Sequence, residues 1–191
     1  MRRRRLRLPW WLWTILGLGA AVGTVAALGG FEEVPIAELP IIELGDVHHG
    51  TQLDTVITAA YLSHRAPGQE YDVDEGEIYI VVEATLLNTT NRPVHGYDAV
   101  RIVVDGAVEP TEKPYGLIEL RRGDVVGPVQ PGLPVAAAYT WVVGETSVSA
   151  GDEIRIGLFE TFAVDDNLIL EDVRTAPTPT ARIVATLGEE P

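Results

Sequence analysis

The chain has 191 residues, of which 14 are basic and 28 acidic, and its net charge is −14. It contains no cysteine, which excludes disulfides, zinc–thiolate sites, thiol catalysis and an acylated-cysteine lipid anchor. The acidic balance argues against nucleic-acid binding, because nucleic-acid phosphates bind basic surfaces. Hydrophobic residues make up 46% of the chain, which is enough for a core and, at this length, for one domain with accessory segments.

The charge is distributed unevenly along the chain. Residues 1–8 contain five arginines, and no acidic residue precedes Glu32. These arginines are Arg2, Arg3, Arg4, Arg5 and Arg7. From Phe31 onward there are nine basic and 28 acidic residues, which gives a net charge of −19. The sequence therefore consists of a basic head, an uncharged stretch and a strongly acidic body.

Residues 9–30 carry no charge and are mostly apolar. As a helix, these 22 residues would span roughly 33 Å, enough to cross a hydrocarbon core of about 30 Å. Tryptophans cluster at the start of the stretch, at Trp10, Trp11 and Trp13. Indoles favour the headgroup boundary, and positive charge is retained on the cytoplasmic side. We therefore expect a cytoplasmic head at residues 1–8, a single-pass anchor in the cell membrane at 9–30 and an extracytoplasmic body.

A cleaved signal peptide is the alternative for the same segment. Residues 25–27 (VAA) fit the small-residue rule for a cleavage site, and the arginines would form its charged start. The apolar run is longer than the usual core of a signal peptide, which favours an uncleaved anchor. In both cases the body is exported.

Residues 31–50 contain a short tandem repeat, PIAEL followed by PIIEL. Each proline restricts its own φ and pushes the preceding residue toward extended geometry, so a continuous helix is not expected. One interpretation is an extended stalk between membrane and body. The other is a first edge strand packed on the body, because Ile36, Leu39, Ile41 and Leu44 are too apolar for a solvated linker.

Residues 51–191 alternate apolar and polar side chains with a period of two. The clearest run is Glu77–Leu87, in which five apolar side chains share one face. Further runs lie at Leu53–Leu62, Val100–Asp105, Tyr115–Leu120, Tyr139–Val143, Ile154–Leu158 and Arg182–Leu187. Such alternation is typical of half-buried strands, and turn residues separate the runs. The sequence predicts an all-β fold, an antiparallel immunoglobulin-like sandwich of about seven strands.

Two stretches of the body are similar to a known family. Residues 76–93 read as a glycine, a long strand, an asparagine, a polar turn and a proline, and residues 129–134 (VQPGLP) precede a strand with Tyr139 and Trp141. Over roughly Thr51–Leu187 the chain resembles the telokin-like, immunoglobulin-fold ectodomains of bacterial surface lipoproteins and secreted antigens. The resemblance implies this fold and a location in the cell envelope. It implies no catalytic residues, and an apolar helix would replace the acylated cysteine that tethers many members.

An acidic cluster at residues 70–77 is the best candidate for a metal site. Its carboxylates are Asp72, Asp74, Glu75 and Glu77. Several carboxylates on one loop can coordinate Ca²⁺, which prefers oxygen ligands. As an EF-hand-type loop starting at Asp72, however, the stretch would place Gly76 at position 5 instead of 6 and would run into a strand. A solvated acidic turn is the favoured interpretation, and a Ca²⁺ site is the alternative.

Other chemistry has weaker support in the sequence. His48 and His49 are adjacent, but a metal site there would need His64 or His95 to converge on them. Residues 147–151 (SVSAG) share the end of a nucleophile elbow but lack its first glycine. We therefore expect no catalytic residues and no bound cofactor, and the protein is not expected to be an enzyme.

Together these observations predict a membrane-anchored extracytoplasmic domain that acts as a non-enzymatic interaction or accessory module of the bacterial cell envelope. The expected partners are the membrane and another envelope or membrane protein, with no nucleic acid. The alternative is a secreted or tethered domain that binds a small ligand or Ca²⁺.

Overall fold

The computed structural model describes residues 39–103, 113–160, 163–164, 173–174 and 177–190. These residues belong to a compact unit that begins at Leu39. The predicted basic head at 1–8 and membrane anchor at 9–30 lie outside the described residues. Within the ranges that are described, no helix is long and apolar enough to span a membrane.

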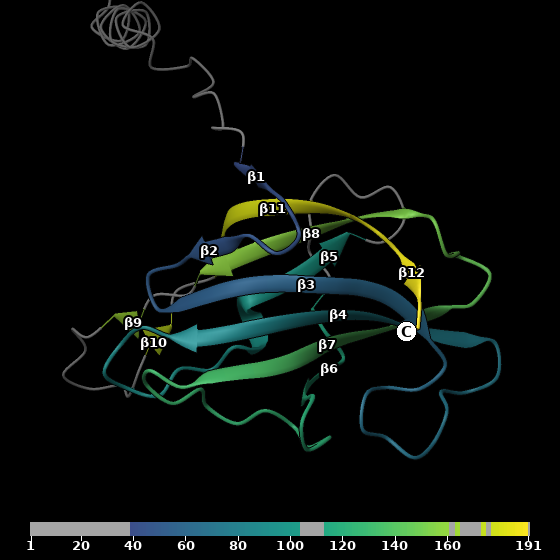
Figure 1. Cartoon of the computed structure of the whole chain (residues 1–191), viewed down its shortest axis with the longest axis horizontal. Coiled ribbons are helices and arrows are strands. Elements are labelled where there is room, and N and C mark those ends of the chain that lie inside the picture. Colours follow the sequence, from purple (N-terminus) through teal and green to yellow (C-terminus); the bar gives the residue numbers. More distant parts are fainter. Residues whose placement is uncertain (1–38, 104–112, 161–162, 165–172, 175–176, 191) are drawn as a thin grey trace, which may run out of the picture. The chain divides into compact units, whose positions relative to one another are not determined.

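The described chain forms a β-sandwich of two sheets (Figure 1). The strands are β1 (Ile41–Ile42), β2 (Val47–His49), β3 (Leu53–Ser63), β4 (Glu77–Asn88), β5 (Val100–Val103), β6 (Gly116–Glu119), β7 (Pro134–Gly144), β8 (Glu153–Glu160), β9 (Ala163–Val164), β10 (Val173–Arg174), β11 (Thr178–Thr186) and β12 (Gly188–Glu189). Sheet A has the order β1-β11-β8-β5, and sheet B has the order β12-β3-β4-β7-β6, with β2 also paired to β3. A 3-10 turn, η1 (Tyr97–Ala99), precedes β5, and β9 pairs with β10.

The seven alternating runs of the sequence coincide with the seven described strands that have four or more residues. These are β3, β4, β5, β6, β7, β8 and β11. The pairs among them are antiparallel, whereas the short strands β1 and β12 join β11 and β3 in parallel. The predicted all-β sandwich is therefore confirmed.

The alternation also predicted which side chains form the core between the sheets. Ile80 and Val82 of β4 are 1% and 0% exposed, and Ile156 of β8 packs into the same cluster from sheet A. Tyr139 and Trp141 point into this core from β7 and stack with ring centroids 6.2 Å apart. Burying such a side chain stabilises the fold by about 1.5–3 kcal/mol. The two sheets are held together mainly by this apolar layer.

The segment Leu39–His49 adds a strand to each sheet along one side of the sandwich (Figure 1). The Arg182 N–H donates to the Pro40 carbonyl at 3.0 Å as β1 joins β11, and β2 then pairs with β3. Gly45, at φ +89°, makes the turn between β1 and β2, a conformation that glycine adopts without strain. For these residues the structure has the edge-strand arrangement, and they belong to the unit that begins at Leu39.

The β3–β4 connection, residues 64–76, crosses the outer face of sheet B, the face turned away from sheet A. A Cβ built on Gly68 would lie 2.2 Å from the Cα of Gly123, which follows β6. Because β4 and β7 separate β3 from β6, the connection reaches Gly123 over the outside of the sheet. Tyr61, Val81 and Ala138 on this face are only 7%, 0% and 0% exposed and form a second apolar cluster. The connection therefore acts as a cover for one outer face.

Candidate functional site

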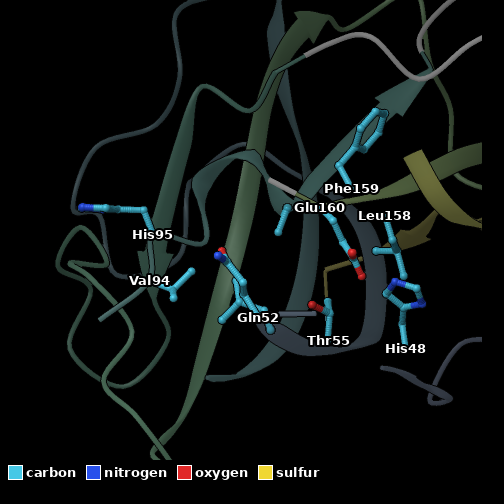
Figure 2. A pocket seen from close by; sticks show the side chains of 10 residues that line it. His48, Gln52, Thr55, Val94, His95, Leu158, Phe159 and Glu160 are labelled. Atoms are coloured by element: carbon cyan, nitrogen blue, oxygen red, sulfur yellow. The ribbon is translucent and has the colours of Figure 1, made fainter. Parts of the chain in front are cut away.

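A polar hollow lies between the two sheets at the end of the sandwich where β3 starts and β8 ends (Figure 2). Its polar lining comes from His48 of β2, Gln52 and Thr55 around the start of β3, His95 before η1, and Glu160 at the end of β8. We refer to it as the His48–Glu160 hollow. It is present because β2 and the start of β3 lie opposite the end of β8 in the other sheet.

The His48–Glu160 hollow is small. The space in it that admits water is about 20 Å³. A single water needs at least about 10–15 Å³, whereas sites for organic ligands are about 300 Å³ or larger. The hollow therefore has room for a water molecule or a small ion, and it is too small for an organic substrate.

Polar groups of the hollow are bonded to the sandwich itself. The Thr180 hydroxyl donates to the Leu158 carbonyl at 3.1 Å, and His48 Nε2 lies 2.9 Å from the same hydroxyl oxygen, so Nε2 is the donor in that pair. The two carboxylate oxygens of Glu160 accept from the Thr51 N–H at 2.9 Å and from the Thr51 hydroxyl at 2.7 Å. These contacts join β2 and the loop before β3 to β8 and β11 of sheet A.

A β-bulge aims Thr180 at His48. The register of β11 against β8 passes from Pro179–Phe159 to Ala181–Leu158, so Thr180 is the extra residue. A bulge turns its residue out of the regular alternation, which here brings the hydroxyl to the imidazole. Burial lowers the pKa of His48, and the negative charge of Glu160 partly opposes this shift. His48 is therefore neutral at neutral pH and acts as a hydrogen-bond donor between the sheets.

The carboxylates predicted as metal ligands lie at the opposite end of the sandwich, on and just after the β3–β4 connection. Asp72 is paired with Arg65, whose Nη2 lies 2.8 Å from Oδ1. Asp74 and Glu75 are exposed, and Glu77 donates its backbone N–H to the Asp74 carbonyl at 3.1 Å. Over the described ranges, no three Asp, Glu or His side chains are grouped so that they could hold a metal ion. The structure thus does not bring these four carboxylates together.

The histidines do not converge on one another. His49 Nδ1 lies 3.2 Å from Asp54 Oδ2, and His64 Nε2 lies 3.6 Å from Glu145 Oε1. Figure 2 shows His95 pointing away from the other polar side chains of the hollow. Each histidine therefore has its own surroundings, and they do not form a shared ligand set.

Thr51, Glu160 and Thr180 were not predicted from the sequence as part of a site. The Thr51–Glu160 contact joins positions 109 residues apart, and the His48–Thr180 contact joins positions 132 residues apart. No local pattern marks such partners. The crowding of polar residues before Gly50 pointed to His48 without identifying the groups that it contacts.

Comparison with known proteins supports the fold alone. No protein-family model and no curated protein matches the chain. The chain is similar to the crystal structure of an uncharacterised β-sandwich protein from Clostridium difficile 630, with a TM-score of 0.52 and 12% identity over 80% of this chain and 97% of that one. A conserved hypothetical protein from Bacillus anthracis has a TM-score of 0.34 at 12% identity, over 60% of this chain and 87% of that one, which is too low to support a conclusion.

Proposed function

We propose that this chain is a membrane-anchored protein whose β-sandwich, of the immunoglobulin-like, telokin-like type, is presented outside the cell. There it acts as a non-enzymatic interaction or accessory module of the bacterial cell envelope, and its partner is another envelope or membrane protein. The basic head and the uncharged stretch at residues 9–30 support the anchoring and its orientation.

The observation that carries the non-enzymatic role is the state of the His48–Glu160 hollow. The cavity volume that a water molecule can enter is only about 20 Å³. His48 and Glu160, its titratable side chains at the sheet interface, are hydrogen-bonded to Thr180 and Thr51. A catalytic site needs polar groups directed at a substrate, whereas these groups link one sheet to the other. Within the described part of the chain, this favours the surface of the sandwich as the part that contacts a partner.

The way in which the chain joins the sandwich supports tethering. β1 and β2 pair with β11 and β3, in different sheets, within a few residues of the start of the folded unit. The N-terminal end of the described domain is thus tied into both sheets, as expected where the chain continues into a tether. In the sequence, residues 31–38 connect the apolar stretch to the unit that begins at Leu39.

A pair of C-terminal reporter fusions to the full-length chain tests the orientation. We expect an alkaline phosphatase, which is active outside the cytoplasm, to be active, and a fluorescent protein that matures only in the cytoplasm to be dark. The matched control replaces the five head arginines by glutamate, which removes the charge that retains the head inside. A C-terminal reporter that is active only in the cytoplasm would contradict the proposal.

In-cell crosslinking tests the role as an interaction module. We expect the full-length chain to crosslink to one defined envelope or membrane protein. That product should disappear when an unrelated domain replaces residues 39–191 on the same anchor. Recovery of the same proteins with the anchor alone would show that the sandwich has no partner of its own.

Calcium titration separates the proposal from its alternative, a domain that binds a small ligand or Ca²⁺. We expect the melting temperature of the full-length protein in neutral detergent to be unchanged at millimolar Ca²⁺, because a ligand stabilises a fold only if it binds the native state. A rise in melting temperature that is lost in Asp74→Asn together with Glu75→Gln would favour the alternative and assign these carboxylates as ligands.

A further inference from the structure

Thr55 is a polar residue at an inward position of β3. Leu53 and Ile57, two residues before and two after it, contribute to the apolar layer between the sheets. Thr55 is only 3% exposed and lines the His48–Glu160 hollow, and its hydroxyl makes no hydrogen bond to any residue of the described ranges. A buried hydroxyl without a partner lowers the stability of a fold. The Thr55 oxygen is therefore free to bind a ligand in the hollow.

The carboxylate of Glu160 reaches the same hollow from sheet A, and its orientation is fixed. Its two oxygens accept from the N–H and the hydroxyl of Thr51, and each oxygen keeps a further lone pair. A Cβ built on Gly50 would lie 2.9 Å from Oε1 of Glu160, so a residue without a side chain makes room for the carboxylate. The loop before β3 thus holds this group in place.

His48, Thr55 and Glu160 meet at this hollow although they come from three strands. His48 of β2 pairs with Thr55 of β3, which places the two side chains on one face of sheet B. Figure 2 shows both of them on the same side of the hollow as Glu160. Gln52 also lines the hollow and offers an amide oxygen. The oxygen donors are thus a carboxylate, a hydroxyl and an amide.

The hollow carries one negative charge without a matching positive one. Among the described residues, no Arg or Lys forms an ion pair with Glu160. The neutral imidazole of His48 adds no positive charge beside it. From Phe31 onward the chain has a net charge of −19, which raises the concentration of cations near its surface. A bound cation would balance the charge of Glu160, whereas a water molecule would not.

We propose that the His48–Glu160 hollow binds one small monovalent cation, Na⁺ or K⁺. Glu160 and Thr55 are its main ligands, and the Gln52 amide oxygen is a third. Hard cations bind oxygen ligands, and a volume of about 20 Å³ suits one particle of the size of water. Ca²⁺ would need six to eight oxygens and would leave a surplus positive charge beside a single carboxylate. A monovalent ion matches both the space and the charge.

Such a cation would connect the two sheets at the end of the sandwich where β3 starts. Thr55 belongs to sheet B and Glu160 to sheet A, so an ion bound by both adds to the contacts that His48 and Thr51 already make. The stability of the sandwich would then depend on the alkali cation in the medium. This inference does not rest on the proposed membrane anchoring.

The test is thermal unfolding of the full-length protein in neutral detergent with three chloride salts at equal ionic strength. The salts are those of Na⁺, K⁺ and choline, whose cation is too large for a hollow of this volume. We expect the melting temperature to be at least about 3 °C higher in NaCl or KCl than in choline chloride, because an ion that binds the native state stabilises it. Broadening of the sodium NMR signal, reversed by K⁺, reports the bound ion directly.

Two substitutions in the hollow and one outside it assign the site. Glu160→Gln and Thr55→Val should each lose most of the difference between the salts. In choline chloride Thr55→Val should melt no lower than the wild type, because it removes a buried hydroxyl that has no partner there. Glu153→Gln is the matched control: Glu153 is an exposed carboxylate at the other end of the same strand, and its variant should keep the difference.

Equal melting temperatures in the three salts would overturn the proposal and assign the hollow to water. A difference that persists in both Thr55→Val and Glu160→Gln would also overturn it, because the ion would then bind elsewhere. If Glu160→Gln does not fold, the nearly isosteric Thr55→Val decides.

The outcome is separable from that of the proposed function. If the topology fusions place the body in the cytoplasm and the melting temperature still depends on the alkali cation, the anchoring fails and the cation site stands. If the fusions place the body outside and the three salts are equivalent, the cation site fails and the anchoring stands.

Discussion

The two sheets of the sandwich have outer faces of opposite character. On sheet B, the β3–β4 connection lies over the strands, and Val81 beneath it is 0% exposed. On sheet A, Val184 is 46% exposed and lies beside Arg155 and Arg182. Both valines occupy outward positions of their strands. The difference shows that an outward position in a strand becomes core only when another segment of the chain covers it.

This comparison also separates structural from functional surface. The covered face of sheet B gains a second apolar cluster and adds to stability. On sheet A, Arg101 and Arg182 each have a buried Nε without a hydrogen-bond partner among the described residues. Buried polar groups that lower the stability of the fold without adding to its packing are the ones that we expect to serve binding.

The largest effect is expected from placing a charge on each face in turn. Val81→Asp buries an unpaired carboxylate in the covered cluster and should lower the free energy of unfolding by more than about 3 kcal/mol. Val184→Asp, its matched control on the other face, should change it by less than about 1 kcal/mol, because the carboxylate stays in water. Urea unfolding measures both. Equal losses would show that the two faces do not differ in cover.

A methyl group where Gly68 contacts Gly123 should loosen the packing of the β3–β4 connection on sheet B. In Gly68→Ala the new Cβ would lie 2.2 Å from the Cα of Gly123, at a φ of +74°. Gly132→Ala is the control, because Gly132 has a similar φ of +70° and open space around it. The control should cost about 1–2 kcal/mol for the backbone conformation alone. We expect Gly68→Ala to cost at least about 2 kcal/mol more, and proteolysis of the 64–76 connection to increase. A similar cost for both variants would argue against tight packing at this point.

The ion pair on the same connection should matter much less. Arg65 and Asp72 are 2.8 Å apart, but their side chains are 53% and 61% exposed. Asp72→Asn should therefore lower the free energy of unfolding by about 1 kcal/mol or less, and by less still in high salt. Thermal unfolding at low and high ionic strength measures this. A loss as large as that of Gly68→Ala would mean that the ion pair, and not the packing, holds the cover in place.

A pH-dependent effect is expected where the two sheets meet, at the His48–Glu160 hollow. Because burial lowers the pKa of His48, the unfolded chain binds a proton more readily than the folded chain does. Stability should thus decrease as the pH falls below about 6.5, the ordinary value, toward the lower folded pKa. In His48→Gln this part of the decrease should be absent, so the variant should gain on the wild type between pH 7 and pH 5. Parallel stability curves over that range would refute the assignment.

Much of the fold was predictable because strand formation depends on local pattern. The alternation in Glu77–Leu87 identified β4 and placed Ile80 and Val82 in the core. The same pattern assigned Val81 to the opposite face, which is correct, but could not show that this face is covered. The prolines of residues 35–44 indicated extended geometry and left stalk and edge strand open, since the two differ only in the presence of a partner strand.

The candidate site was less predictable, because its contacts join distant segments. The acidic residues at 70–77 are close in sequence, yet Asp72 pairs with Arg65 and the other carboxylates do not gather around a common centre. The partners of His48 are on β11 and β8, far along the chain. Short spacing suggested a shared site, whereas the fold separated near neighbours and joined remote residues.

By itself, the sequence determined the β-sandwich, the inward side of each strand and the contrast between a basic head and an acidic body. The first two follow from the alternation of apolar and polar side chains along each strand, which is a local pattern. The third follows from counting charged residues, which needs no knowledge of the fold. The tertiary structure alone decided that the outer face of sheet B is covered and that Arg101, Gly157 and Arg182 lie in one row. Their alignment depends on the register of three strands that lie far apart in the chain, and strand register is set by packing across the whole sandwich.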